Sequence, residues 1–103
     1  MLELDDTKVR REFMRWVMLL ALYNGRPAGA VESTLLATAQ AMYPDATKHE
    51  VRLWLDYLGE RGLVRIDKRP DGKWCGHLTR TGTDVVEYAV DCEPGIARPA
   101  KCE

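Results

Sequence analysis

The first strong pattern in the chain is a recurrence of apolar residues at three- and four-residue spacing, which predicts a helix over residues 7–23. Asp5 and Asp6 stand where amino-terminal caps are favoured, and Asn24 with Gly25 marks the carboxyl-terminal end. The polar residues between the apolar ones predict that one stripe of this helix is buried. The expected stripe consists of Val9, Phe13, Trp16, Val17 and Leu20.

The same spacing predicts a second, shorter helix in the middle of the chain. It is expected to begin at a cap formed by Ser33 or Thr34 and to end before Pro44, because the residue before a proline avoids helical dihedral angles. Its expected apolar face consists of Leu35, Leu36, Ala39 and Met42.

The boundary before the third helix, residues 47–61, is the sharpest in the sequence. Thr47 and Glu50 match a capping box, in which each side chain accepts a hydrogen bond from the backbone amide of the other residue. Gly62 is suited to the left-handed backbone conformation that the residue after a helix often adopts. The expected buried stripe consists of Val51, Trp54, Leu55 and Leu58, and the residues left to solvent or a ligand are Lys48, His49, Arg52, Asp56 and Glu60.

Apolar and polar residues alternate after this helix, which predicts a β-hairpin with strands over residues 63–67 and 74–78. The connecting loop, residues 68–73, is basic and is stiffened by Pro70. A weaker stretch over residues 28–32 could add one brief strand to the same sheet.

A fourth helix is expected to start at a cap, Thr79 or Thr81, and to run to Asp91. A chain of 103 residues has room for one hydrophobic core, so we expect a single domain over residues 1–91 and a short flexible tail over residues 92–103. Together these elements predict an α+β fold that is mainly α.

Composition excludes several classes of protein. No apolar run is long enough to span a bilayer, and the first residues lack the basic patch of a secretory signal, so we expect a cytoplasmic protein without a membrane segment. Cys75, Cys92 and Cys102 form no C-x-x-C pair, so reduced thiols are expected rather than disulfides. Cys75 and His77 share one face of a strand, but they supply too few ligands to predict a metal site.

Charge is distributed unevenly along the chain, although the formal net charge is only −1. Residues 1–6 hold three acids and no base, and residues 82–103 hold five acids and two bases. Residues 7–46 hold five bases and three acids, and residues 47–81 hold eight bases and five acids. The middle of the chain is therefore its basic part, and the near-neutral total argues against a protein that coats nucleic acid without specificity.

The most specific motif begins in the third helix. It reads Trp54-Leu55-x-x-Leu58-x-x-Arg61-Gly62-Leu63-Val64-x-Ile66, followed by the basic loop and then Leu78-Thr79-x-Thr81-Gly82. This run and the order of the predicted elements resemble winged helix-turn-helix DNA-binding domains, in particular bacterial regulators of the multiple-antibiotic-resistance, arsenic-repressor and phenolic-acid-repressor types. The resemblance covers residues 7–91 and implies a three-helix core, a β-hairpin wing and a carboxyl-terminal helix. The size and layout also resemble small winged-helix proteins of bacteriophages and prophages.

The resemblance implies a small transcriptional regulator that binds double-stranded DNA as a homodimer. The expected dimer interface is the exposed side of the first or fourth helix. Helix 47–61 would read the major groove, and the wing, residues 68–73, would contact the backbone or the minor groove. The side chain best suited to the paired acceptors of guanine is Arg52, while Thr47 and Lys48 could instead bind phosphate at the helix start. The expected DNA-binding residues are Thr47, Lys48, His49, Arg52, Lys68, Arg69 and Lys73.

Two alternatives stay open for these residues. They could form a solvated surface without a ligand, and Glu50, Asp56 and Glu60 on the same helix favour that interpretation because acids weaken contact with phosphate. A winged helix can also bind a protein partner, for instance in a phage assembly or regulatory complex. The sequence holds no Gly-rich phosphate loop and no nucleophile-elbow serine, so neither an enzyme nor a cofactor is expected.

Overall fold

The computed structural model of the chain describes residues 6–101. Within this range the chain forms four helices and one three-stranded antiparallel sheet, so the fold is α+β and mainly helical. In chain order the elements are α1 (Asp6–Asn24), β1 (Ala30–Val31), α2 (Glu32–Met42), α3 (Lys48–Glu60), β2 (Val64–Lys68), β3 (Trp74–Leu78) and α4 (Arg80–Val86). This order is the one that the sequence predicts. None of these helices is long and apolar enough to cross a membrane.

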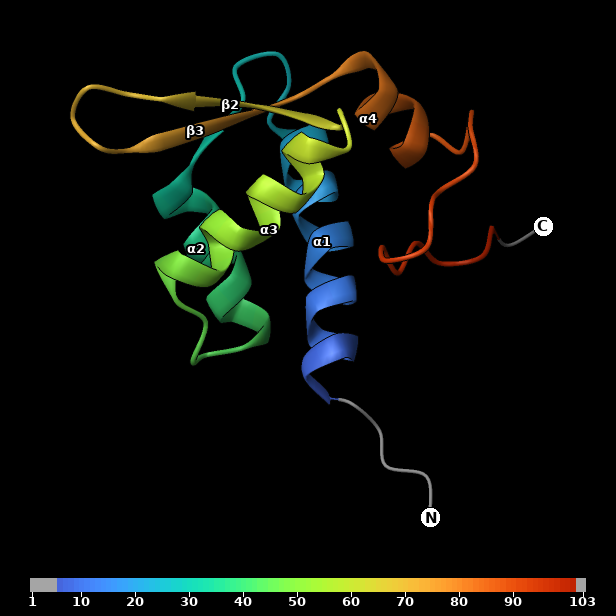
Figure 1. Cartoon of the computed structure of the whole chain (residues 1–103), viewed down its shortest axis with the longest axis horizontal. Helices are drawn as coiled ribbons and strands as arrows, with labels where there is room; N and C mark the ends of the chain where they lie inside the picture. Colours follow the sequence, from blue (N-terminus) through green and yellow to red (C-terminus); the bar gives the residue numbers. More distant parts are fainter. Residues whose placement is uncertain (1–5, 102–103) are drawn as a thin grey trace.

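The sheet has the strand order β1-β3-β2, so the brief strand β1 and the hairpin strand β2 flank β3. Figure 1 shows α1, α2 and α3 gathered on one side of the sheet, with the β2–β3 hairpin extending past them. Gly76 lies in the central strand opposite Ala30 and Ile66. A Cβ atom at this position would lie 3.3 Å from a methyl group of Leu22, so the glycine allows α1 to pack closely against the sheet.

The predicted organisation of α3 is confirmed. Its predicted stripe is buried, and Thr47 and Glu50 form the capping box, with 3.2 Å between each backbone nitrogen and the side-chain oxygen that accepts from it. Gly62 follows the helix with a φ of 73°, in the left-handed region. The buried stripe consists of Val51, Trp54, Leu55 and Leu58.

The predicted stripe of α1 is wrong in part. Trp16 and Val17 are buried, but Val9 and Phe13 are 54% and 37% exposed. The core begins at Met14, so the first two turns of α1 stay exposed. Farther along the helix, the ring of Trp16 also packs edge-on against Tyr88, which follows α4. The buried residues of α1 are Met14, Trp16, Val17, Met18, Leu19 and Leu22, which do not lie on a single stripe. The expected caps lie outside the described residues, since Asp5 and the side chain of Asp6 are not described.

The start of α2 also differs from the prediction. The helix begins at Glu32, immediately after Val31, and no side chain caps it, whereas we expected a cap at Ser33 or Thr34. Its end is confirmed at Tyr43, but Met42 is 48% exposed rather than part of a buried face. The earlier start places Glu32 in the first turn, where a carboxylate is favoured by the helix dipole.

Helix α4 is capped by Thr79, whose Oγ1 accepts a hydrogen bond from the Gly82 amide at 3.0 Å. The predicted end at Asp91 is wrong, because the helix stops at Val86 and Tyr88 adopts the left-handed conformation with a φ of 61°. A non-glycine residue in that conformation cannot continue an α-helix.

Residues 92–101 pack against the helices, in contrast to the loose tail that we expected. Ile96 is 7% exposed, and the amide of Ala97 donates to the carbonyl oxygen of Glu12 in α1 at 3.0 Å. The guanidinium of Arg98 donates to a backbone carbonyl of α4 at 2.9 Å. The segment therefore runs back beside α1 (Figure 1).

Candidate functional site

A buried ion pair links the start of α2 to the second turn of α3. Glu32 is 3% exposed, and it is the only charged residue that is buried in the part of the chain that the structure describes. Its carboxylate accepts two hydrogen bonds from Arg52, from Nε at 2.7 Å and from Nη2 at 2.8 Å. These bonds hold the pKa of Glu32 below its usual value despite burial, and a hydrogen bond from the backbone of Trp74 acts in the same direction.

Arg52 also joins α3 to the turn of the β2–β3 hairpin. Its Nη2 donates to the carbonyl oxygen of Gly72 at 2.7 Å, and its guanidinium lies 4.7 Å from the centre of the Trp74 ring. The ammonium of Lys68 lies 4.5 Å from the same ring centre. Gly72 has a φ of 84°, which the turn requires. One arginine thus holds the hairpin tip beside the amino-terminal half of α3.

This position of Arg52 differs from the exposed one that we expected for a residue that reads bases. The helical spacing correctly placed Arg52 outside the buried stripe of α3. It did not reveal the partner, because Glu32 lies 20 residues earlier and the start of α2 was expected after it. An acid in the first turn of a helix is the one signal in the sequence that could have pointed to Glu32.

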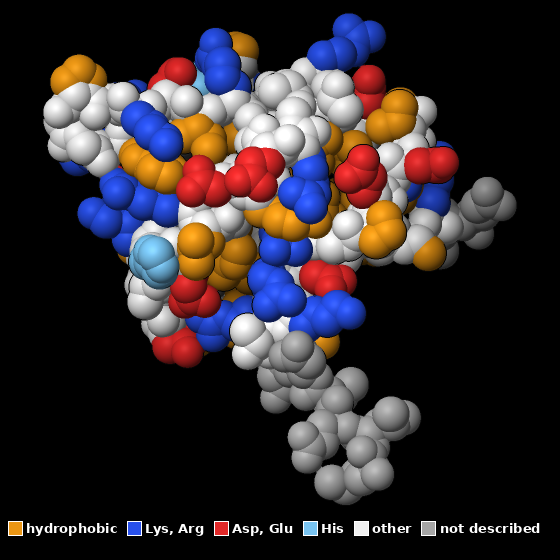
Figure 2. All heavy atoms as spheres, in the orientation of Figure 1, with side chains coloured by type: hydrophobic (Ala, Val, Ile, Leu, Met, Phe, Trp, Pro, Cys, Tyr) orange, Lys and Arg blue, Asp and Glu red, His pale blue; other side chains and the backbone are white. Residues whose placement is uncertain are grey.

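The other expected DNA-binding residues, apart from Thr47, have exposed side chains, and four of these five side chains are those of basic lysine or arginine. Lys48 and His49 begin α3, and Lys68, Arg69 and Lys73 surround the hairpin turn. We call these five residues the basic surface. Figure 2 shows Lys and Arg side chains gathered where the hairpin approaches the amino-terminal end of α3.

The hairpin turn is closed by its backbone, which leaves its basic side chains exposed. The amide of Arg69 donates to the carbonyl of Lys73, and the amide of Gly72 donates to the carbonyl of Arg69, both at 2.9 Å. Asp71 accepts from the amide of Lys73 at 3.0 Å. Among the residues 7–101 whose side chains are described, no carboxylate forms an ion pair with Arg69 or Lys73.

Thr47 differs from the other expected DNA-binding residues, because its side chain has a structural role. Its hydroxyl oxygen accepts the amide proton of Glu50 in the capping box. Glu50 in turn accepts from Arg10 of α1 at 3.0 Å. The start of α3 is therefore fixed both by its own cap and by α1.

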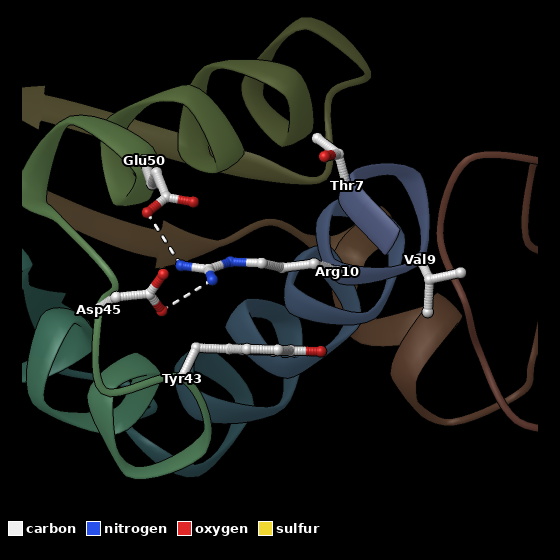
Figure 3. Close-up of a pocket in the computed structure, with 6 residues that line it drawn as sticks. All are labelled: Thr7, Val9, Arg10, Tyr43, Asp45 and Glu50. Carbon is white, nitrogen blue, oxygen red and sulfur yellow. Dashed lines mark hydrogen bonds and ion pairs between the residues drawn. The ribbon is translucent and has the colours of Figure 1, made fainter. Parts of the chain in front are cut away.

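An open hollow of about 530 Å³ lies beside this cap, between α1 and the α2–α3 turn (Figure 3). Arg10 extends across it and donates to Asp45 at 2.8 Å and to Glu50 at 3.0 Å, while its guanidinium lies 4.5 Å from the Tyr43 ring centre. The hydrogen bond to Asp45, ahead of the other interactions, raises the pKa of Arg10 above its usual value. The charged groups of the hollow thus pair with one another, which indicates a structural role.

A small polar cluster lies on the outer face of the sheet. His77 Nε2 lies 3.2 Å from Asp67 Oδ2 and 3.7 Å from Cys75 Sγ. The sheet register places Asp67 opposite Cys75, a juxtaposition that spacing along the chain does not indicate. No group of three acidic, histidine or cysteine residues suited to a metal is found among the described residues. Cys75 and Cys92 are free thiols, and Cys102 lies outside the described range.

No protein-family model matches the chain, and no curated protein matches it. Among solved structures, the chain is similar to a candidate DNA-binding protein from Ralstonia eutropha JMP134, with a TM-score of 0.59 and 18% sequence identity. The match covers 86% of this chain and 100% of the other chain. At this level of identity the similarity shows that the two chains share a fold, and it leaves the ligand to be argued from the side chains.

Proposed function

We propose that this chain is a winged-helix protein that binds double-stranded DNA. In this proposal α3 enters the major groove, and the β2–β3 hairpin is the wing that contacts the sugar-phosphate backbone or the minor groove. The DNA-binding residues would be those of the basic surface, with Thr47 at the helix start beside a phosphate.

The observation that carries the proposal is the hydrogen bond from Arg52 to Gly72 at 2.7 Å. This bond keeps the hairpin tip, with its three cations, beside the exposed residues Lys48 and His49 that begin α3. Two basic segments held at a fixed spacing suit the two phosphate-lined edges of a groove. The fold shared with a candidate DNA-binding protein supports the same ligand.

Arg52 takes a different role in this proposal from the one that its sequence position suggests. Its guanidinium already donates to Glu32 and Gly72, so we infer that it positions the hairpin against α3. Arg52→Ala should then weaken DNA binding on every sequence by releasing the hairpin, and it should lower stability at the same time.

Salt dependence of binding gives the direct test. Each phosphate that a cation neutralises contributes about 0.9 to the slope of log affinity against log salt. Replacing both Arg69 and Lys73 with alanine should flatten that slope by about two, with labelled genomic fragments as the probe. The matched control replaces Arg11 and Arg80, two exposed arginines on α1 and α4, and should leave the slope unchanged.

Failure of the wild-type chain to bind any duplex at low salt would contradict the proposal. The homodimer that the resemblance implies stays a prediction, and sedimentation of the free chain and of its complex would test it. Expected is one protein dimer per site, with half-sites one helical turn apart.

A protein partner is the second candidate, and the acidic part of α3 favours it. Asp56 and Glu60 follow the basic start of the helix, and Glu60 is exposed. Carboxylates repel phosphate, whereas they can pair with a basic polypeptide. If the basic surface binds a protein, the Arg69 and Lys73 double variant should lose its affinity for that protein, and its weak affinity for DNA should stay unchanged.

A further inference from the structure

The outward face of α3 is defined by the stripe that it buries. A helix turns by 100° per residue, so the residues opposite Val51, Leu55 and Leu58 project farthest from the core. They are His49, Leu53, Asp56 and Glu60. In the amino-terminal half of the helix, the outward positions are therefore those of His49 and Leu53.

The residues beside this outward line are engaged within the protein. On one flank Arg52 bonds to Glu32 and Gly72. On the other flank Glu50 accepts a hydrogen bond from Arg10, and the guanidinium of Arg15 stacks on the ring of Tyr57. A ligand in front of α3 would consequently meet His49 and Leu53 before any other side chain in the first two turns.

Leu53 has no role in the packing of the domain. It is 53% exposed, and it belongs neither to the buried core nor to the partly buried apolar residues that pack against that core. An isolated apolar residue is common on protein surfaces. Leu53 is distinctive because it lies at the centre of a face whose other outward side chains are polar or charged.

We propose that Leu53 reads the C5 methyl group of thymine on the floor of the major groove, an inference that rests on the proposed function. Thymine is the only unmodified DNA base that presents a methyl group there, and apolar side chains recognise it by direct contact. Phosphates and sugars, by contrast, offer a leucine no comparable apolar partner at the groove floor. His49, one turn earlier, would lie at the neighbouring base pair.

The test uses duplexes selected from a randomised library by the wild-type chain and then synthesised with deoxyuridine in place of one thymidine at a time. Deoxyuridine keeps every hydrogen-bonding group of thymidine and lacks only the methyl. Burial of one methyl-sized group corresponds to about a fourfold change in affinity, so one or two positions should show a loss of about fourfold. In Leu53→Ala the same deoxyuridine should cause no further loss, because the methyl has no partner.

Val9→Ala is the matched control, since Val9 is 54% exposed on α1. This variant should keep the full deoxyuridine effect. Both variants should unfold at the wild-type temperature, because neither side chain lies in the core. Equal deoxyuridine losses in wild type and Leu53→Ala, or no loss in either, would overturn the inference while leaving DNA binding intact. Absence of binding to any member of the library would overturn the proposed function together with it.

Discussion

Two arginine-centred networks join the helices, one at Arg10 and one at Arg52, and they differ in how much water reaches the carboxylates. Arg10 of α1 donates to Asp45 and Glu50, whose side chains are 78% and 32% exposed. Arg52 of α3 donates to Glu32, whose side chain is 4% exposed. Water can replace the arginine at the first site, and at the second it cannot reach the carboxylate.

This difference determines what each network contributes. When an exposed ion pair forms, its two groups give up contacts with water for contacts with each other, so the pair adds little to the stability of the fold. A buried carboxylate has already lost its water, so its stability depends on the partner that remains. The network at Arg52 also holds the hairpin turn, which we propose contacts DNA, since Arg52 bonds to that turn at Gly72. We therefore expect function and stability to be coupled at Arg52 and separate at Arg10.

The largest expected effect is that of Arg52→Ala. The substitution leaves the Glu32 carboxylate buried without its charged partner and releases the hairpin turn. We expect the Tm to fall by about 10 °C or more. Thermal unfolding followed by circular dichroism measures this change.

The control for Arg52→Ala is the double variant that adds Glu32→Gln. An amide costs less to bury than an unpaired carboxylate, so part of the lost Tm should return. A Tm loss for Arg52→Ala no larger than that for Arg10→Ala would contradict the distinction between the two networks.

What could be predicted from the sequence was local. The capping box of Thr47 and Glu50 joins residues three apart, and Gly62 ends α3 by its own conformational freedom. The hairpin followed from alternation and turn residues. Each of these features depends on neighbours within one or two turns of chain, which is the range that pattern and spacing cover.

What could not be predicted depends on packing between distant segments. Glu32 meets Arg52 across 20 residues, and the first two turns of α1 expose Val9 and Phe13 because the core begins farther along the helix. A buried charge also runs against the expectation that charged residues lie outside, so no apolar pattern could identify Glu32. The expected DNA-binding residues consequently stay a prediction, and the contacts of Arg52 with Glu32 and Gly72 could not be predicted from the sequence.

The second expected effect is a pH dependence that originates at Glu32. Its pKa is lowered in the folded chain, chiefly by the hydrogen bonds from Arg52, so its ionised form stabilises the fold. That contribution is complete above a pH of about 4.3, the pKa of a glutamate in an unfolded chain, and it is lost as the pH falls through the lower pKa of Glu32 in the folded chain. The free energy of unfolding, measured in urea from neutral pH down to pH values below the pKa of a free glutamate, should decline more steeply for wild type than for Glu32→Gln. Parallel declines would show that Glu32 carries no special share of the acid sensitivity.

A smaller effect is expected for Arg10→Ala. Removing this arginine breaks bonds to two carboxylates that water can reach, so the free energy of unfolding should fall by about 1 kcal/mol at low salt. The capping box stays intact, because Thr47 and Glu50 bond directly to each other. High salt should shrink the difference from wild type, and urea unfolding at two salt concentrations measures it. A loss of stability as large as that of Arg52→Ala would show that the two networks contribute equally to the fold.

The smallest effect on stability is expected for Arg69→Ala. Arg69 is exposed at the hairpin turn, and the bonds that close the turn come from its backbone, whose amide donates to the carbonyl of Lys73 and whose carbonyl accepts from Gly72. Alanine keeps both groups, so the Tm should stay within about 2 °C of wild type. Affinity for DNA should nevertheless fall on every duplex, because the guanidinium is exposed beside the start of α3. A clear drop in Tm would assign the side chain a part in folding. Unchanged stability with unchanged affinity would remove Arg69 from the surface that we propose binds DNA.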